Sequence, residues 1–264
     1  MFMLYFRAMI LRIFLPLLVL IACSCSNKEN ATNDSTKEVS TEINYQAEQI
    51  AFEDSIYKFR VELNYPVFES NNPGFETMLN SLIQEKIREY RSFEVEYRDN
   101  FDEMMASLGT RKGIGENDLI VNFRVIDSCS NVLSLIFEVG TFYMGSAQST
   151  FFQDCFNFDK RDMSPIYASN IFGSTEDVLI PLTAMINEKV KTMDENQCEG
   201  LSGPEELYHF INNFNISPNG ISFHFSDFSL CPFAGTDPSI FLKWDDIRSL
   251  TRRGIVSDYC AVNS

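Results

Sequence analysis

The stretch "YKFRVELNYPVF", residues 57–68, decides the fold because its first nine side chains alternate between apolar and polar. A period of two over Tyr57–Tyr65 is typical of a β-strand with one buried face. Pro66 cannot donate a ladder hydrogen bond, so it predicts the end of this strand or an edge position. The folded body therefore begins, on this pattern, with a half-buried strand.

A helical pattern follows this strand. Apolar residues recur every three or four positions between residues 75 and 101, and charged residues occupy the opposite face. Asn72 and Pro73 form a typical helix start. An apolar stripe of this kind indicates a helix that packs on a core.

Three further alternating runs predict three consecutive strands. They cover Leu119–Val125, Leu133–Val139 and Phe152–Phe158, with short turns between them. Such an arrangement indicates an antiparallel meander. The Gly113–Gly115 segment before them lacks the lysine and further glycine of a phosphate loop, so it predicts a plain turn.

The rest of the chain alternates between helical and strand signals. Ser174 and Asp177 resemble a capping box before a helix that reaches Val190, and a shorter helix is predicted over Ser202–Phe214. Pro218-Asn219-Gly220 predicts a hairpin turn. The order β-α-β-β-β-α-α-β-β-β predicts an α+β fold with helices packed on antiparallel sheets.

The first residues predict a cellular address. Two arginines precede a short apolar run, Phe14–Ile21, and Leu20-Ile21-Ala22-Cys23 resembles the bacterial lipobox. We expect residues 1–22 to be a lipoprotein signal peptide and Cys23 to be the lipidated residue, with Cys25 as the alternative acceptor. An ordinary signal peptide or a single membrane span are the competing interpretations, although the run falls short of about 20 apolar residues.

The polar segment at residues 23–51 predicts a flexible tether between a membrane and the folded body. The net charge of the chain is −16, and cleavage before Cys23 would remove two arginines and lower it to −18. Nucleic acid is not an expected partner, because binding it requires a basic patch. We expect a lipid-anchored protein of the bacterial cell envelope, on the periplasm-facing side of the outer membrane because no acidic run follows Cys23.

The residue inventory gives no signal for catalysis or cofactors. The chain has two histidines, His209 on a predicted helix and His224 on the polar face of a predicted strand, and no C-x-x-C motif, so no metal site and no cofactor is predicted. No G-x-S-x-G elbow or Cys/His pair occurs. A glycosidase site formed by distant carboxylates remains an alternative. Disulfides and buried thiols are both compatible with the five cysteines that follow the leader, which are Cys129, Cys155, Cys198, Cys231 and Cys260.

Several stretches in order carry a resemblance to a known family. They are "YKFRVELNYPVF", "LSLIFEVGTFYMGSAQSTFFQDCFNFD", "NIF" and "ISPNGISFHFSDFSLCPFAGTDPSIFLKW". The chain resembles the extracytoplasmic module of PdaC-type peptidoglycan deacetylases and of the anti-sigma factor RsiV. This resemblance implies two adjoining subdomains, a PdaC-type domain at residues 52–148 and an RsiV-type domain at 149–253, with a tail at 254–264. It does not extend to the catalytic domain of the deacetylases.

The resemblance also directs attention to the turn at Gly145. The family turn reads Gly-Gly-Ala-His, and here glutamine occupies the histidine position, while a family tyrosine is Phe228. Both changes remove groups that exchange protons near neutral pH. The small residues of this turn predict a simple connection between two neighbouring strands. A loop that recognises a ligand is the alternative. As ligand-binding candidates we take Tyr143, Gly145, Gln148, Asp159, Phe228 and Phe233.

These expectations define a function of binding rather than catalysis. We expect a non-enzymatic envelope lipoprotein that binds a basic protein or a cell-wall glycan such as a peptidoglycan fragment. The RsiV-type resemblance implies lysozyme as one such protein, and an acidic body complements a basic lysozyme. A cell-wall hydrolase with an unrecognised carboxylate site and a structural scaffold are the alternatives.

Overall fold

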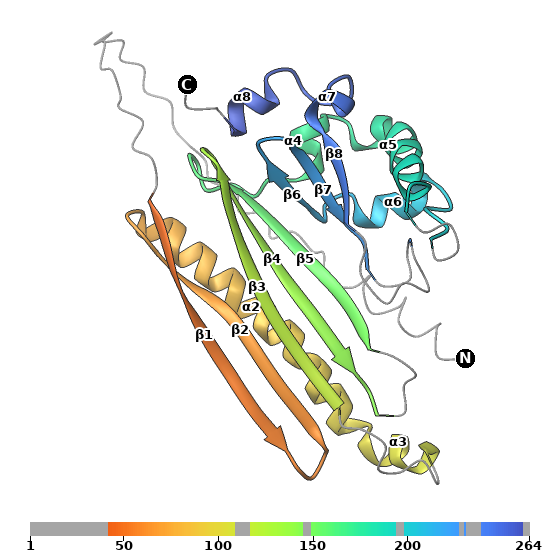
Figure 1. Ribbon diagram of the computed structural model, residues 1–264. Coiled ribbons are helices and arrows are strands. Elements are labelled where there is room, and N and C mark those ends of the chain that lie inside the picture. The colour runs from red at the N-terminus through yellow and green to blue at the C-terminus, as the bar shows by residue number, and fades with distance from the viewer. Residues whose placement is uncertain are drawn as a thin grey trace, which may run out of the picture. The chain divides into compact units, whose positions relative to one another are not determined.

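The structure, a computed structural model, describes residues 42–108, 117–144, 149–193, 198–226, 230 and 239–260. Residues Val39–Ser264 belong to one compact unit. The unit contains a five-stranded sheet of order β1-β2-β3-β4-β5 and a three-stranded sheet of order β6-β7-β8, with helices packed on both (Figure 1). The predicted α+β class is confirmed.

The first sheet and its helices form the N-terminal lobe. Its strands are β1 (Ile43–Asp54), β2 (Phe59–Ser70), β3 (Asn117–Cys129), β4 (Val132–Phe142) and β5 (Thr150–Asp159), and its helices are α2 (Pro73–Asp99) and α3 (Phe101–Leu108). Asn72 caps α2, because its side chain accepts hydrogen bonds from the backbone N–H groups of Gly74 and Phe75. The predicted helix start is confirmed. The buried face of α2 carries one residue per turn against the sheet, from Phe75 through Leu79 and Ile83.

Strand β1 corrects the predicted tether. Residues 43–51 belong to this strand, which pairs antiparallel with β2 along its whole length, from Ile43↔Ser70 to Asp54↔Phe59. No stripe of buried apolar residues marks it, because eight of its twelve side chains are exposed and the other four are half-buried. Ile43, Ile50 and Phe52 pack half-buried against the core, and the ladder with β2 holds the rest of the strand, so no sustained period-two pattern appears in the sequence.

The predicted antiparallel meander of three strands is confirmed by β3, β4 and β5, but the first sheet as a whole is mixed. Strands β2 and β3 run parallel, with Phe59↔Asn117 and Leu63↔Val121 in register, whereas β3, β4 and β5 are antiparallel neighbours. The 27-residue helix α2 lies between β2 and β3 in sequence and returns the chain to the same end of the sheet. Pro66 lies beyond the last β2 residue that pairs with β3, so its missing N–H removes no bond on that side.

The second sheet and the remaining helices form the C-terminal lobe. Its elements are α4 (Ala168–Phe172), α5 (Thr175–Val190), α6 (Pro204–Phe210), β6 (Phe214–Ser217), β7 (Gly220–His224), β8 (Ser239–Lys243), α7 (Trp244–Ile247) and α8 (Ile255–Tyr259). Ser174 caps α5 by accepting from the Asp177 N–H, as predicted. The predicted hairpin joins β6 to β7, and Gly220 is required there because a Cβ would lie 2.1 Å from the Leu242 carbonyl oxygen.

Strand β5 lies at the boundary between the hydrophobic cores of the two lobes. The sequence predicted a boundary at residues 148/149, but β5 follows that point and pairs with β4 in the first sheet. One face of β4 and β5 packs on α2, and the other face meets β6. Six consecutive residues of β4, Val132–Phe137, are therefore buried. The two hydrophobic cores meet across this pair of strands.

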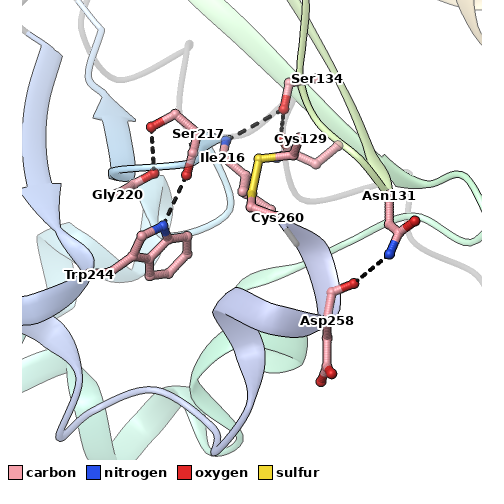
Figure 2. The surroundings of a disulfide bond; sticks show 10 residues. Cys129, Asn131, Ser134, Ile216, Ser217, Gly220, Trp244, Asp258 and Cys260 are labelled. Carbon is pink, nitrogen blue, oxygen red and sulfur yellow. Dashed lines mark hydrogen bonds between the residues drawn. A yellow bond between two sulfur atoms is a disulfide. The ribbon is translucent and has the colours of Figure 1, made fainter. Parts of the chain in front are cut away.

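The C-terminal residues pack on the body. The sequence predicted a tail at 254–264, but α8 buries Ile255 and Tyr259, and a disulfide joins Cys260 to Cys129 at the end of β3 (Figure 2). Asn131 adds two hydrogen bonds, from its N–H to the Tyr259 carbonyl (3.1 Å) and from its Nδ2 to the Asp258 carbonyl (2.8 Å). Small buried apolar residues at the C-terminus are a weak sequence signal, so this docking was not predicted.

The other cysteines differ in state. Cys198 is also disulfide-bonded, and its partner lies outside the described residues. Cys155 keeps its thiol, which is buried between the two lobes and donates to Asn215 Oδ1 at 3.5 Å. Both states that the sequence left open therefore occur in the chain.

Candidate functional site

Tyr143 lies just after β4 and packs against the C-terminal part of α2. Its ring stacks on Tyr97, with ring centroids 6.3 Å apart. Burial, together with the negative charge of Glu96, raises the pKa of Tyr143 to about 12. The phenol therefore stays protonated at neutral pH, and most of the ring is used for packing.

Asp159 lies at the opposite end of the same strand pair. Its carboxylate accepts hydrogen bonds from the backbone N–H and the Nε of Arg161, both at 2.9 Å, and the Arg161 guanidinium lies over the Tyr259 ring. Thr141 pairs with Thr150 at one end of β4–β5, and Val132 pairs with Asp159 at the other. Nine residues at about 3.4 Å each separate these ends by about 30 Å. Tyr143 and Asp159 consequently do not belong to one site.

The other predicted site residues lie outside the described residues. These are Gly145, Gln148, Phe228 and Phe233, the lipidation candidates Cys23 and Cys25, and the Gly113–Gly115 segment. The predictions for them stay predictions.

The two histidines lie in different surroundings. His209 is exposed on α6, whereas His224 is only 4% exposed on β7. The predicted polar face for His224 is wrong, because β7 is the central strand of its sheet and its second face meets β5. Burial, with a contribution from the positive charge of Arg124, lowers the pKa of His224 to about 4, and neither ring nitrogen bonds to any residue that the structure describes.

Polar side chains join the two lobes under β5. Asn213 donates from Nδ2 to the carbonyls of Gln153 (2.7 Å) and His224 (3.1 Å) and accepts from the Cys155 N–H (2.9 Å). Ser134 donates to Asn157, which in turn donates to the Phe214 carbonyl at 2.7 Å. These bonds satisfy buried backbone groups, so the cluster holds the lobes together and is not open to a ligand.

A pocket of about 430 Å³ opens on the C-terminal lobe between α5 and α6. Ser174, Glu176, Tyr208, Ile211 and Asn212 line it. Ser174 and Glu176 come from the start of α5, Tyr208 projects from α6, and Ile211 and Asn212 follow α6 directly. The volume lies in the range of about 300–1,000 Å³ that small-molecule sites occupy.

The lining combines one aromatic surface with several polar groups. The Tyr208 side chain is 58% exposed. Asn212 Oδ1 accepts from the Ala168 N–H at 2.9 Å, and its Nδ2 bonds to none of the described residues. A flat ring beside an amide, a hydroxyl and a carboxylate can contact the apolar face of a ligand and bond to its hydroxyl groups.

The pocket lining contains a single carboxylate. A glycosidase uses two carboxylates that flank the bond, and Glu176 is the one carboxylate among the residues that line the pocket. Among the described residues, no group of three or more His, Cys, Asp or Glu side chains could hold a metal ion. None of the helices in the described part of the chain is both long and apolar enough to cross a bilayer.

Sequence reasoning did not find this pocket. Ser174 was predicted as a helix cap. Tyr208 and Asn212 fell within the helix predicted over Ser202–Phe214, which in the structure ends at Phe210. The exposed tyrosine beside a helix end was the one available signal, and only the fold brings α5 next to α6.

The fold places the chain among α+β proteins in which a mixed five-stranded sheet is followed by a smaller antiparallel sheet. It is similar to a crystal structure of a DUF3298-family member from Bacteroides fragilis, with 17% identity and a TM-score of 0.57 over 83% of this chain and 97% of that chain. A DUF3298-family protein from Pseudomonas aeruginosa is similar over the same shares, with 8% identity and a TM-score of 0.52. At these identities the likeness shows the fold alone. No protein-family model and no curated protein matches the chain.

Proposed function

We propose that this chain is a lipid-anchored protein of the bacterial cell envelope that binds a cell-wall glycan without chemical turnover. The pocket between α5 and α6 carries the proposal, because its exposed Tyr208 ring and its surrounding polar groups suit a sugar. Sugars present an apolar face for stacking and hydroxyl groups that need both donors and acceptors. The resemblance to PdaC-type envelope proteins is consistent with such a ligand.

Calorimetric titration of the full chain with soluble peptidoglycan fragments tests this proposal. Replacing Tyr208 by Ala is expected to weaken binding about tenfold, since a lost aromatic contact of about 1.4 kcal/mol corresponds to that factor. Tyr167→Ala is the matched control, because Tyr167 is 52% exposed but does not line the pocket. Binding that is absent, or equally weakened by both variants, would reject the pocket as the glycan site. Release of shortened fragments would instead favour the hydrolase alternative.

A basic protein is the second candidate ligand, and the charge balance favours it. The chain has 37 acidic and 21 basic residues. Such a surface attracts a cationic protein over a range of about 10 Å at 0.1 M salt. Lysozyme is the natural probe, given the RsiV-type resemblance. Binding to lysozyme that weakens steeply with salt supports this candidate, and its absence at low salt would remove it.

The envelope address rests on the leader and on the cysteines. A lipobox-like sequence ends at Cys23, and the Cys129–Cys260 disulfide suits an oxidising compartment such as the periplasm. Labelling cells with a palmitate analogue tests the anchor. Cys23→Ser should abolish labelling and Cys25→Ser should not, whereas loss of label only in the second variant would move the acceptor to Cys25.

A further inference from the structure

We propose that the free edge of β1 is a docking site for an extended, basic segment of a partner protein, which adds to the sheet as a sixth strand. The inference deepens the protein-binding candidate above, on which it rests, by naming the surface and the form of the partner. Strand β1 forms one margin of the five-stranded sheet, and no described strand pairs with its outer edge (Figure 1).

An edge strand offers a row of backbone N–H and C=O groups to another chain. Residues alternate along an antiparallel strand, so about half of the backbone groups of β1 point away from β2. The strand is 12 residues long and pairs with β2 without a register shift. The edge is therefore long and regular enough to align a second strand.

Bulges, prolines and lysines, which often protect an edge, are missing from β1, and acidic side chains are its exposed charges. Native edges are blunted by bulges, prolines, inward charges or lysines, or by short strands. The sequence "INYQAEQIAFED" of β1 has no proline, glycine, lysine or arginine. Its ladder with β2 has no bulge, whereas the β3–β4 ladder shifts register between Ile126 and Cys129.

The charges on β1 select the kind of strand that can add. Glu48 and Glu53 are exposed on it, and Glu42 precedes it. Asp54 is paired with Arg98 at 2.9 Å and so contributes less. Like charges on opposing strands repel, whereas opposite charges attract. A second copy of β1 carries the same negative charge and no basic residue, so a strand with alternating lysine or arginine is the favoured occupant.

The exposed side chains of β1 also fit a long cationic side chain. Tyr45 is 47% exposed and contacts Phe68 and Phe123 from the edge. A lysine or arginine of the added strand can lie over such a ring while its charge stays hydrated. The backbone gives the pairing, and the acidic and aromatic side chains give the preference for basic residues.

A synthetic peptide as long as β1, with alternating lysine and threonine, is the probe. Its control is the same peptide with every backbone nitrogen methylated, which keeps the charge and removes the N–H donors. The full chain is expected to bind the first peptide at least about tenfold more tightly, because several backbone hydrogen bonds are lost in the control. In hydrogen exchange, amides of β1 that are open in the chain alone should become protected when the first peptide is added.

Two charge variants give a second, independent readout. Glu53→Lys should weaken peptide binding about fivefold at low salt, and less at high salt. Glu199→Lys makes the same charge change at an exposed site of the C-terminal lobe and should have little effect. Both positions are exposed, so neither variant disturbs a core.

Four outcomes would overturn the proposal. Equal affinity for both peptides would mean that charge alone acts. Protection of the outer β1 amides before peptide is added would mean that the chain itself or a second copy already covers the edge, and sedimentation distinguishes these two occupants. Protection elsewhere would place the site on another surface. Lysozyme binding without peptide binding would reject this surface and leave the protein-binding candidate intact.

Discussion

Strands β4 and β1 belong to one sheet and have similar lengths, 11 and 12 residues, but they are held in different ways. Residues Val132–Phe137 of β4 are all buried, because α2 packs on one face and the C-terminal lobe on the other. In β1, no side chain is fully buried. A strand can therefore be held mainly by buried side chains, as β4 is, or mainly by its backbone ladder with a few half-buried side chains, as β1 is.

This difference has a consequence for stability. Burial of apolar side chains gives most of the free energy of folding, whereas a backbone ladder gives a small net gain per hydrogen bond. We therefore expect the half of the sheet around β4 to be the rigid part, and β1 to open at lower cost.

Phe137→Ala should have the largest effect. Phe137 is fully buried on β4, and its ring meets Tyr90 and Phe156. Its loss should lower the free energy of unfolding by about 4 kcal/mol. Phe52→Ala on β1 removes the same side chain from a half-buried position and should cost about 1 kcal/mol. Urea denaturation of both variants measures the contrast, and equal losses would show that the two strands are held alike.

Loss of the disulfide should come next. Cys129 and Cys260 are 131 residues apart, so their bond restricts a long loop in the unfolded chain. Replacing both by serine should destabilise the protein by about 3 kcal/mol. Hydrogen exchange should become faster in α8, which the bond anchors, and stay unchanged in β1. A reductant should then lower the stability of the unmodified chain more than that of the variant, and an equal loss would count against the bond as a source of stability.

The same contrast explains what could be predicted from the sequence. The β4 core and the α2 stripe were predicted because burial imposes a period on side chains, and the Asn72 cap and the Gly220 turn were predicted because local backbone chemistry demands them. Strand β1 was missed because its pairing leaves no such period. The parallel β2–β3 pair was missed because neighbours in a sheet are set by where α2 returns the chain.

The candidate site was less predictable than the fold. The pocket joins the beginning of α5 to the end of α6, and the sequence carries no sign that these segments meet. Tyr143 and Asp159 were chosen from one continuous stretch, but an extended strand pair places them at opposite ends. Closeness in sequence predicts closeness in space poorly for residues in strands.

His224 lies under the covered half of the sheet and should make stability depend on pH. Its pKa is about 4 in the folded protein, against 6.5 for an ordinary histidine. The stability that the neutral ring allows is therefore fully present above pH 6.5. The free energy of unfolding falls as the pH falls towards 4, because the unfolded chain binds the proton at a higher pH than the folded protein does. The loss should reach about 3 kcal/mol near pH 4.

The variant His224→Leu isolates this effect. Within the described part of the chain neither ring nitrogen has a hydrogen-bond partner, so leucine leaves no bonded group behind there and should change stability little at pH 7. Urea denaturation measures the free energy of unfolding of both proteins. Between pH 7 and pH 4, the leucine variant should lose less of it than the unmodified chain. Parallel curves over that interval would mean that the buried ring does not resist protonation.

The smallest expected loss of stability comes from a comparison of the two edge strands of the first sheet, β5 and β1. At β5, Asn213 takes the place of a neighbouring strand over part of the edge, because it bonds to the carbonyl of Gln153 and to the N–H of Cys155. The backbone of residues 164–166 covers the end of the strand. Asn213→Ala leaves these groups and the His224 carbonyl without their partner and should cost about 2 kcal/mol. Asn213→Asp keeps the acceptor for Cys155 and loses both donors, so it should also destabilise the protein.

Gln49→Ala at the β1 margin is the matched control, because Gln49 is an exposed polar residue on the opposite edge strand. It should change stability by less than about 0.5 kcal/mol, and the Cys155 amide should exchange faster only in the Asn213 variants. If both margins respond alike, Asn213 does not seal β5. If only β5 responds, the Asn213 side chain seals that edge, whereas the β1 edge does not depend on the Gln49 side chain.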